Sequence, residues 1–206
     1  MSHLPRRLFL TAAAALVAAA GLGLPAMAAA PAPLGDDGLH HATWMHDTFR
    51  NLSDDLAEAN ASGKRLLLIV EQRGCIYCTR MHEKVFTDDR IAKLLTDKFF
   101  VVQVNLFGDT EVTDFDGTAL PEKKMANKWG VMFTPTMIFL PEEVPEGKGV
   151  RDAAVAMMPG AFEKGTTLDL LEWVLAHGYD TGENFQTYVQ SKVNDQIDST
   201  ITPPTN

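Results

Sequence analysis

Apolar and polar positions along this 206-residue chain follow two periods, one helical and one extended, and the changes between them outline the elements of a fold. From residue 44, apolar side chains recur at spacings of three and four, which is the helical period: Phe49, Leu52, Leu56 and Ala59. Gly63 follows and predicts the end of this helix. Residues 65–70 then form an apolar run of the length expected for a buried strand.

The remaining elements alternate between the two periods. Two cysteines follow the first strand directly, and a helix is predicted after them. A second helical stretch is predicted to begin at a cap formed by residues 87–89 (Thr-Asp-Asp). Further strands are predicted at 99–106, 136–140 and 155–158, and further helices at 120–129, 168–176 and, in a polar tail, 185–193. The order before the tail is α-β-α-β-α-β-β-α, for which a central mixed β-sheet flanked by helices is the economical α/β architecture.

Composition and charge narrow the class of protein. The chain is 46% hydrophobic and 22% charged, as in an ordinary globular domain that can bury a core. Its net charge is −9 and it contains no run of Lys and Arg, so we expect no nucleic-acid partner. The acidic stretch at 109–116 predicts a solvated loop.

The first 28 residues have the composition of a secretory signal peptide. Arg6 and Arg7 precede an apolar stretch at 8–24, and Ala-Met-Ala at 26–28 offers a cleavage site, so we expect cleavage near Ala28. The paired arginines, followed by Phe-Leu, resemble a twin-arginine signal, and a general secretory signal is the alternative. We therefore expect the mature protein in the periplasm, not embedded in the membrane.

The mature chain divides into three parts by composition. Residues 29–43 contain several Pro and Gly and predict a flexible leader. Residues 44–179 hold the predicted elements and form the expected domain, and residues 180–206 form a polar C-terminal tail.

The two cysteines of the chain, Cys75 and Cys78, carry the clearest chemical signal. A structural disulfide stabilises a protein most when it links segments that are distant in the chain. A disulfide across a two-residue spacer restricts the unfolded chain very little. Zinc would need further soft ligands, and haem attachment would need His where Thr79 stands. Redox chemistry is the interpretation that remains.

The predicted place of these cysteines, between a buried strand and a helix, suits that chemistry. Unpaired N–H groups and the positive end of the helix dipole favour thiolate over thiol at a helix N-terminus. The thiolate is the attacking species in disulfide exchange. We therefore expect Cys75 to attack a partner disulfide and Cys78 to resolve the mixed disulfide that results.

Several short motifs resemble the thioredoxin superfamily. They are Gly74-Cys75-Ile76-Tyr77-Cys78 between strand and helix, Trp-Gly-Val at 129–131 and Thr-Pro-Thr at 134–136. Val-Phe-Thr-Asp at 85–88 and Pro-Gly-Ala at 159–161 resemble a bacterial thioredoxin-like branch. The layout of signal, CxxC, Thr-Pro-Thr and short polar tail is similar to the periplasmic thioredoxins of sulfur-oxidation clusters (SoxW type). The resemblance covers about residues 44–179.

The resemblance implies a thioredoxin fold and a dithiol that reduces protein disulfides, with no cofactor beyond a redox-active Cys75–Cys78 disulfide. In the family, the proline that corresponds to Pro135 is cis, lies against the CxxC motif, and follows a residue whose backbone pairs with the substrate as an added strand. By this resemblance, we expect substrate binding at Ile76, Tyr77, Thr134 and Pro135.

The resemblance also implies partners. They are protein disulfide clients, of the sulfur-oxidation or cytochrome c maturation kind, and a membrane thiol transporter as electron donor; we expect a monomer. Two alternatives stay open at this point. One is an oxidase or isomerase that forms or shuffles disulfides, and the other is a copper chaperone that uses both thiolates and His82.

The sequence departs from the family pattern in the strand before the cysteines. Thioredoxins carry a buried acid six residues before the first cysteine, and Ile69 stands there. Glu71 is the nearest acid and is our candidate for proton transfer, with its orientation left open because side chains alternate along a strand. We expect no metal site: His82 is interpreted as a packed helix residue, and His40, His41 and His46 as part of a solvated, mobile leader.

Overall fold

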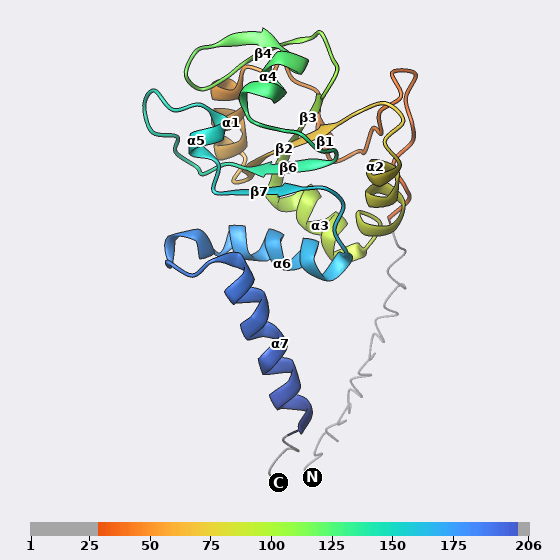
Figure 1. Cartoon of the computed structure of the whole chain (residues 1–206), viewed down its shortest axis with the longest axis vertical. Helices are drawn as coiled ribbons and strands as arrows, with labels where there is room; N and C mark the ends of the chain where they lie inside the picture. Colours follow the sequence, from red (N-terminus) through yellow and green to blue (C-terminus); the bar gives the residue numbers. More distant parts are fainter. Residues whose placement is uncertain (1–28, 202–206) are drawn as a thin grey trace, which may run out of the picture.

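The computed structural model describes residues 29–201, which fold around a mixed five-stranded sheet with helices on both faces (Figure 1). The strand order is β1-β3-β2-β6-β7, and a separate two-stranded sheet pairs β4 with β5. The strands are β1 (Met45–His46), β2 (Arg65–Glu71), β3 (Phe99–Asn105), β4 (Glu111–Thr113), β5 (Ala119–Pro121), β6 (Thr136–Phe139) and β7 (Ala156–Pro159). The α-helices are α1 (Leu52–Ala61), α2 (Ile76–Arg80), α3 (Asp89–Lys98), α4 (Glu122–Lys128), α5 (Val150–Ala153), α6 (Lys164–Leu175) and α7 (Phe185–Ile201).

Strand β2 lies at the centre of the sheet, parallel to β3 and antiparallel to β6. All of its residues are buried, as the apolar run predicts. Leu67 and Ile69 point into a core with α3 and α6, and Leu68 and Val70 point into a second core with α1 and α4. The predicted fold class, a central mixed sheet flanked by helices, is confirmed.

The start of the first helix differs from the expectation. Helix α1 begins at Leu52, and Asn51 caps it by accepting a hydrogen bond from the backbone N–H of Ser53 at 3.2 Å. Phe49, predicted to lie on the buried helical face, is outside the helix and fully exposed. The spacing of apolar residues placed the start of the helix too early, because a capping residue, and not that spacing, determines where the helix begins. The cap predicted for α3 is confirmed, because Asp88 accepts from the N–H of Arg90.

The acidic stretch at 109–116 is not wholly a solvated loop. Part of it forms β4, which pairs with β5, and Asp114 is only 1% exposed. The side chain of Asp114 accepts hydrogen bonds from Lys128 Nζ, from the indole N–H of Trp129 and from the backbone N–H of Val150. This carboxylate therefore joins the hairpin to α4 and to α5, a short helix that the sequence did not predict.

The second half of the segment expected to be a flexible leader packs against the domain. Leu39 and His40 are buried, and Leu34 forms an isolated antiparallel bridge with His40. The carbonyl of His40 accepts a hydrogen bond from Gln103 of β3 at 2.8 Å. At the other end, the expected polar tail contains α7, which is longer than the helix predicted at 185–193.

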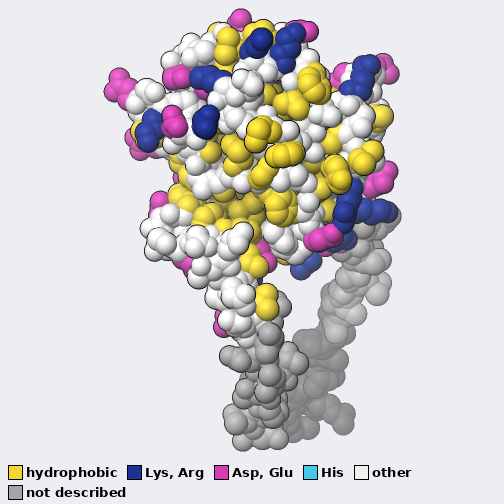
Figure 2. Space-filling model, in the orientation of Figure 1, with side chains coloured by type: hydrophobic (Ala, Val, Ile, Leu, Met, Phe, Trp, Pro, Cys, Tyr) yellow, Lys and Arg dark blue, Asp and Glu magenta, His cyan; other side chains and the backbone are white. Residues whose placement is uncertain are grey.

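A groove of about 560 Å³ lies between the edge strand β7 and the helices α6 and α7, and Figure 2 shows hydrophobic side chains gathered over this region. Met157 and Met158 both line it; Met158 belongs to the core, and Met157 is exposed. Among residues 29–201, no helix has the length and hydropathy needed to cross a bilayer. The predicted signal peptide lies outside the described residues.

Candidate active site

The cysteines are positioned by the turn that joins the centre of the sheet to α2. Gly74 has φ of +71°, a left-handed conformation that favours glycine, and it turns the chain from β2 into the helix. Cys75 is the N-cap residue of α2 and Cys78 lies in its first turn. The predicted strand, CxxC motif and helix therefore lie in the expected order.

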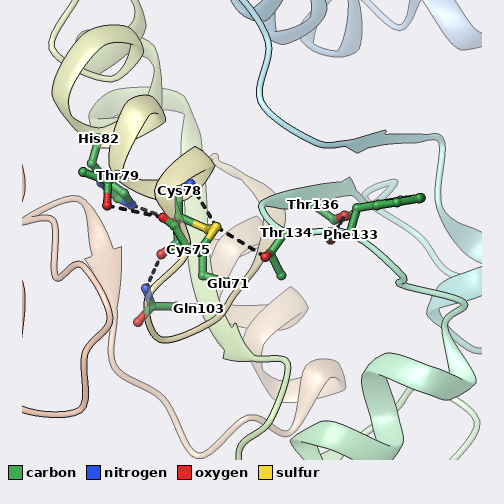
Figure 3. Close-up of a disulfide and its surroundings, with 9 residues drawn as sticks. All are labelled: Glu71, Cys75, Cys78, Thr79, His82, Gln103, Phe133, Thr134 and Thr136. Carbon is green, nitrogen blue, oxygen red and sulfur yellow. Dashed lines mark hydrogen bonds and ion pairs between the residues drawn. A yellow bond between two sulfur atoms is a disulfide. The ribbon is translucent and has the colours of Figure 1, made fainter.

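Cys75 and Cys78 form a disulfide whose two sulfur atoms differ in their surroundings (Figure 3). Cys75 Sγ accepts hydrogen bonds from the backbone N–H of Cys78 at 3.0 Å and from Thr134 Oγ1 at 3.3 Å. Cys75 is 7% exposed and Cys78 is 1% exposed. Two donors directed at Cys75 Sγ stabilise negative charge there, because a thiolate is a stronger acceptor than a thiol.

The Thr134–Pro135 peptide bond is cis, and it follows Phe133 directly beside the disulfide. Pro135 is tied to the sheet end, because its carbonyl accepts from the N–H of Gly160 at 2.7 Å. Among the described residues, no backbone hydrogen bond engages the N–H or the carbonyl of Thr134. These free groups next to Cys75 can pair with an extended peptide.

Exposed apolar side chains flank the disulfide on two segments. Ile76 and Tyr77, both predicted substrate positions, are 73% and 56% exposed. Met132 and Phe133 are 78% and 60% exposed, and the sequence interpretation missed them. The signal that could have found them is their position, since two large apolar residues stand directly before Thr134 and outside any predicted strand. We call Ile76, Tyr77, Met132 and Phe133 the apolar rim.

Glu71 is the last residue of β2, and its carboxylate is directed to His82 and Gln103. In Figure 3, Glu71, His82 and Gln103 lie on one side of the disulfide, and Thr134 lies on the other. Glu71 is 1% exposed; its Oε1 lies 3.0 Å from His82 Nε2, and its Oε2 accepts from Gln103 Nε2 at 2.7 Å. Within the described part of the chain, neither oxygen is hydrogen-bonded to a cysteine. The proton-transfer role expected for Glu71 stays a prediction.

His82 lies on a π-helical turn (Met81–Val85) that directly follows α2, and its side chain is buried, as a packed helix residue should be. His40, expected in a solvated leader, is buried instead, with its ring stacked on that of His82 at 4.4 Å. Burial lowers the pKa of His40, and nearby His82 lowers this pKa further. His41, by contrast, is exposed and pairs with Asp37.

One family model and several solved structures are similar to this chain. Residues 52–172 match a family model described as a thioredoxin-like domain. Among solved structures, a thioredoxin from Thermus thermophilus has 27% identity and a TM-score of 0.48, and the match covers 65% of this chain and 90% of that one. A thioredoxin-fold protein from Helicobacter pylori has 18% identity and a TM-score of 0.46, covering 77% and 93%. The oxidised C-terminal domain of DsbD from Neisseria meningitidis has 13% identity and a TM-score of 0.40, covering 59% and 89%. No curated protein matches the chain.

Proposed function

Because this chain belongs to the family of thioredoxin-like domains, we propose that it is a thiol-disulfide oxidoreductase that reduces disulfides in client proteins. The observation that carries the proposal is the Cys75–Cys78 disulfide at the start of α2, with two hydrogen-bond donors directed at Cys75 Sγ. A disulfide of this spacing contributes little to stability, so its value lies in being opened and closed.

The reaction begins with the protein in its dithiol form. The Cys75 thiolate attacks one sulfur of a client disulfide, which forms a mixed disulfide and releases the other client sulfur as a thiolate that takes up a proton. Cys78 then loses its proton and attacks Cys75 Sγ, which closes the Cys75–Cys78 disulfide and releases the second client thiol. Two electrons pass from the dithiol to the client.

The roles of the two cysteines follow from their surroundings. Cys75 is the more exposed sulfur and has the donors that stabilise a thiolate, so it meets the client first. Cys78 is only 1% exposed, so it is shielded from a bulky client, and its position beside Cys75 Sγ suits it to resolve the mixed disulfide. A client strand would pair with the backbone of Thr134, while the apolar rim covers side chains on either side of the client disulfide.

The direction of electron flow is argued from the charges near Cys75. The spacer residues Ile76 and Tyr77 supply no cation. Two arginines flank the motif, but Arg73 donates to the carbonyls of Asp36 and Asp37, and Arg80 pairs with Glu163. Both guanidinium groups are held by these oxygen acceptors, and among the described residues neither donates to Cys75 Sγ. A strongly oxidising dithiol needs an unusually stable thiolate. This supports a reductant.

The cellular context of the proposal rests on the sequence. A signal peptide cleaved near Ala28 would place the protein in the periplasm, where it would act as a monomer. Electrons would come from a membrane thiol transporter, and the SoxW-type layout favours sulfur-oxidation or cytochrome c maturation proteins as clients. Among the described residues, His82 is hydrogen-bonded to Glu71 and to neither cysteine, which favours the oxidoreductase over a copper chaperone built on the cysteines and His82.

Trapping of mixed disulfides tests the oxidoreductase proposal. A Cys78→Ser protein keeps the attacking thiol and lacks the resolving one, so it should accumulate covalent adducts with a disulfide-containing protein such as insulin. A Cys75→Ser protein should accumulate about tenfold fewer, because its remaining thiol is buried. Non-reducing electrophoresis measures both, with the double serine variant as baseline. Equal trapping by the two variants, or trapping by Cys75→Ser alone, would show that the roles are assigned wrongly.

A further inference from the structure

Three buried side chains, none of them hydrogen-bonded to a cysteine in the described part of the chain, converge behind the disulfide. They are His40 from the N-terminal segment, Glu71 from the end of β2 and His82 from the π-helical turn. One ligand atom of each, a ring nitrogen or a carboxylate oxygen, lies within 4.8 Å of those of the other two. Residues 31, 42 and 11 positions apart in the chain thus meet at one point inside the protein.

We propose that His40, Glu71 and His82 bind one divalent transition-metal ion, with Zn²⁺ as the reference ion. Two imidazoles and one carboxylate are a donor set that suits Zn²⁺ and other first-row transition ions, whereas Ca²⁺ and Mg²⁺ prefer all-oxygen sites. The site contains no sulfur, so metal binding can be measured with the cysteines held as a disulfide, and the proposal does not rest on the proposed redox function. An ion bound there would occupy the carboxylate of Glu71, the candidate for proton transfer.

The carboxylate of Glu71 is buried, and among the described residues no Lys or Arg pairs with it; the ring nitrogen beside it is His82 Nε2. A buried carboxylate without a permanently charged partner is costly. One bound divalent cation would neutralise this carboxylate and take His82 Nε2 as a second ligand. The other ring nitrogen of His82, Nδ1, has no hydrogen-bond partner among the described residues, so the ring can carry its proton there and leave the lone pair of Nε2 for the ion.

A second layer of contacts holds the ligands in place. Gln103 Nε2 donates to Glu71 Oε2 at 2.7 Å and to the carbonyl of His40 at 2.8 Å. Its amide therefore fixes the carboxylate and the N-terminal segment relative to each other, as outer-shell groups of metal sites do. The ring of Trp44 also lies nearly parallel to that of His82, with 6.1 Å between the ring centroids.

Two of the three ligand atoms already have the spacing that an ion needs, and the third must move. Glu71 Oε1 and His82 Nε2 are 3.0 Å apart, close to the ~3.4 Å between ligands of a tetrahedral ion with bonds of about 2.1 Å. The ring of His40 is stacked nearly parallel on that of His82, so their lone pairs do not yet point to one place. A rotation of the His40 side chain out of this stack, with a shift of at most about 1.4 Å, would bring its ring nitrogen to the ion.

The test uses the full mature chain in its oxidised form, so that no thiolate can bind metal. Calorimetric titration with Zn²⁺ should show one equivalent bound, and Co²⁺ should give the visible absorption of a four-coordinate nitrogen and oxygen site. His40→Ala should weaken binding by about a hundredfold or more, because even outer-shell partners contribute 10–100-fold. His41→Ala is the matched control, since His41 is adjacent and exposed, and it should leave the affinity unchanged.

A second measurement needs no variant and guards against misfolding of His40→Ala. In the wild-type protein, NMR of the imidazole nitrogens should show that Zn²⁺ shifts the signals of His40 and His82 and leaves those of His41 and His46 in place. Absence of stoichiometric binding, equal losses in His40→Ala and His41→Ala, or shifts confined to His41 and His46 would each overturn the proposal.

Discussion

Replacing Cys75 by serine should abolish the reduction of insulin by this protein with dithiothreitol as electron source, lowering turnover by about a thousandfold or more. A serine hydroxyl is not ionised near neutral pH and cannot form a mixed disulfide, so the first step is lost. Serine is close to cysteine in size, and Cys75 is the N-cap residue of α2, a position that serine favours, so the fold should survive. The turbidity of precipitating insulin measures the rate.

Thr134→Val is the informative companion to that variant. It removes only the hydroxyl that donates to Cys75 Sγ and should slow the reaction by a few-fold, through a higher pKa of the Cys75 thiol. Near-UV circular dichroism checks that both proteins are folded. Turnover by folded Cys75→Ser above one-tenth of the wild-type rate would contradict the assignment of Cys75 as the nucleophile.

The largest effect on stability is expected from Asp114→Ala, which should lower the free energy of unfolding by about 3–5 kcal/mol. The substitution leaves the indole N–H of Trp129 and the backbone N–H of Val150 buried without an acceptor, and it removes the buried partner of Lys128. Chemical denaturation in urea gives the change from the shift in midpoint.

Asp116→Ala is the matched control for Asp114→Ala. Asp116 binds the same Lys128 Nζ at 2.6 Å, but it is partly exposed, so its loss should cost only about 1 kcal/mol or less. If the two substitutions destabilise the protein equally, Asp114 is not the structural centre of the β4–β5 hairpin and α4.

The parts of the fold that could be predicted from the sequence carry their signals within a few residues. Strand β2 is an apolar run, Asp88 is a capping residue next to a helical pattern, and the cysteines stand at a strand-to-helix turn opened by Gly74. Each of these features depends on neighbours in the chain. The order of elements, and with it the location of Cys75 and Cys78, followed from them.

The parts that could not be predicted depend on contacts between distant segments. His40 stands in a stretch with several Pro and Gly, and its burial depends on Gln103, 63 residues away, and on stacking against His82. Asp114 appears in an acidic stretch that predicts exposure, yet it is buried because Lys128, Trp129 and Val150 supply donors. No local pattern distinguishes such a carboxylate from a solvated one.

One polar residue offered a signal that the sequence interpretation did not use. Gln103 interrupts an otherwise apolar strand, and a polar side chain at such a position needs a buried partner. It has two, the carboxylate of Glu71 and the carbonyl of His40. Asking what Gln103 contacts would have pointed to the buried cluster.

The measurement that tests the central claim most directly is the reduction potential of the Cys75–Cys78 pair in graded glutathione buffers. A reductant should have a potential close to the about −270 mV of thioredoxin, whereas a disulfide-forming oxidase has about −120 mV. In a buffer poised at about −200 mV the two cases separate almost completely, since ~30 mV changes the ratio of disulfide to dithiol tenfold. We predict that nearly all of the protein is then in the disulfide form, as read from alkylation of free thiols. If nearly all of it is in the dithiol form, the protein is an oxidant and the proposed function is wrong.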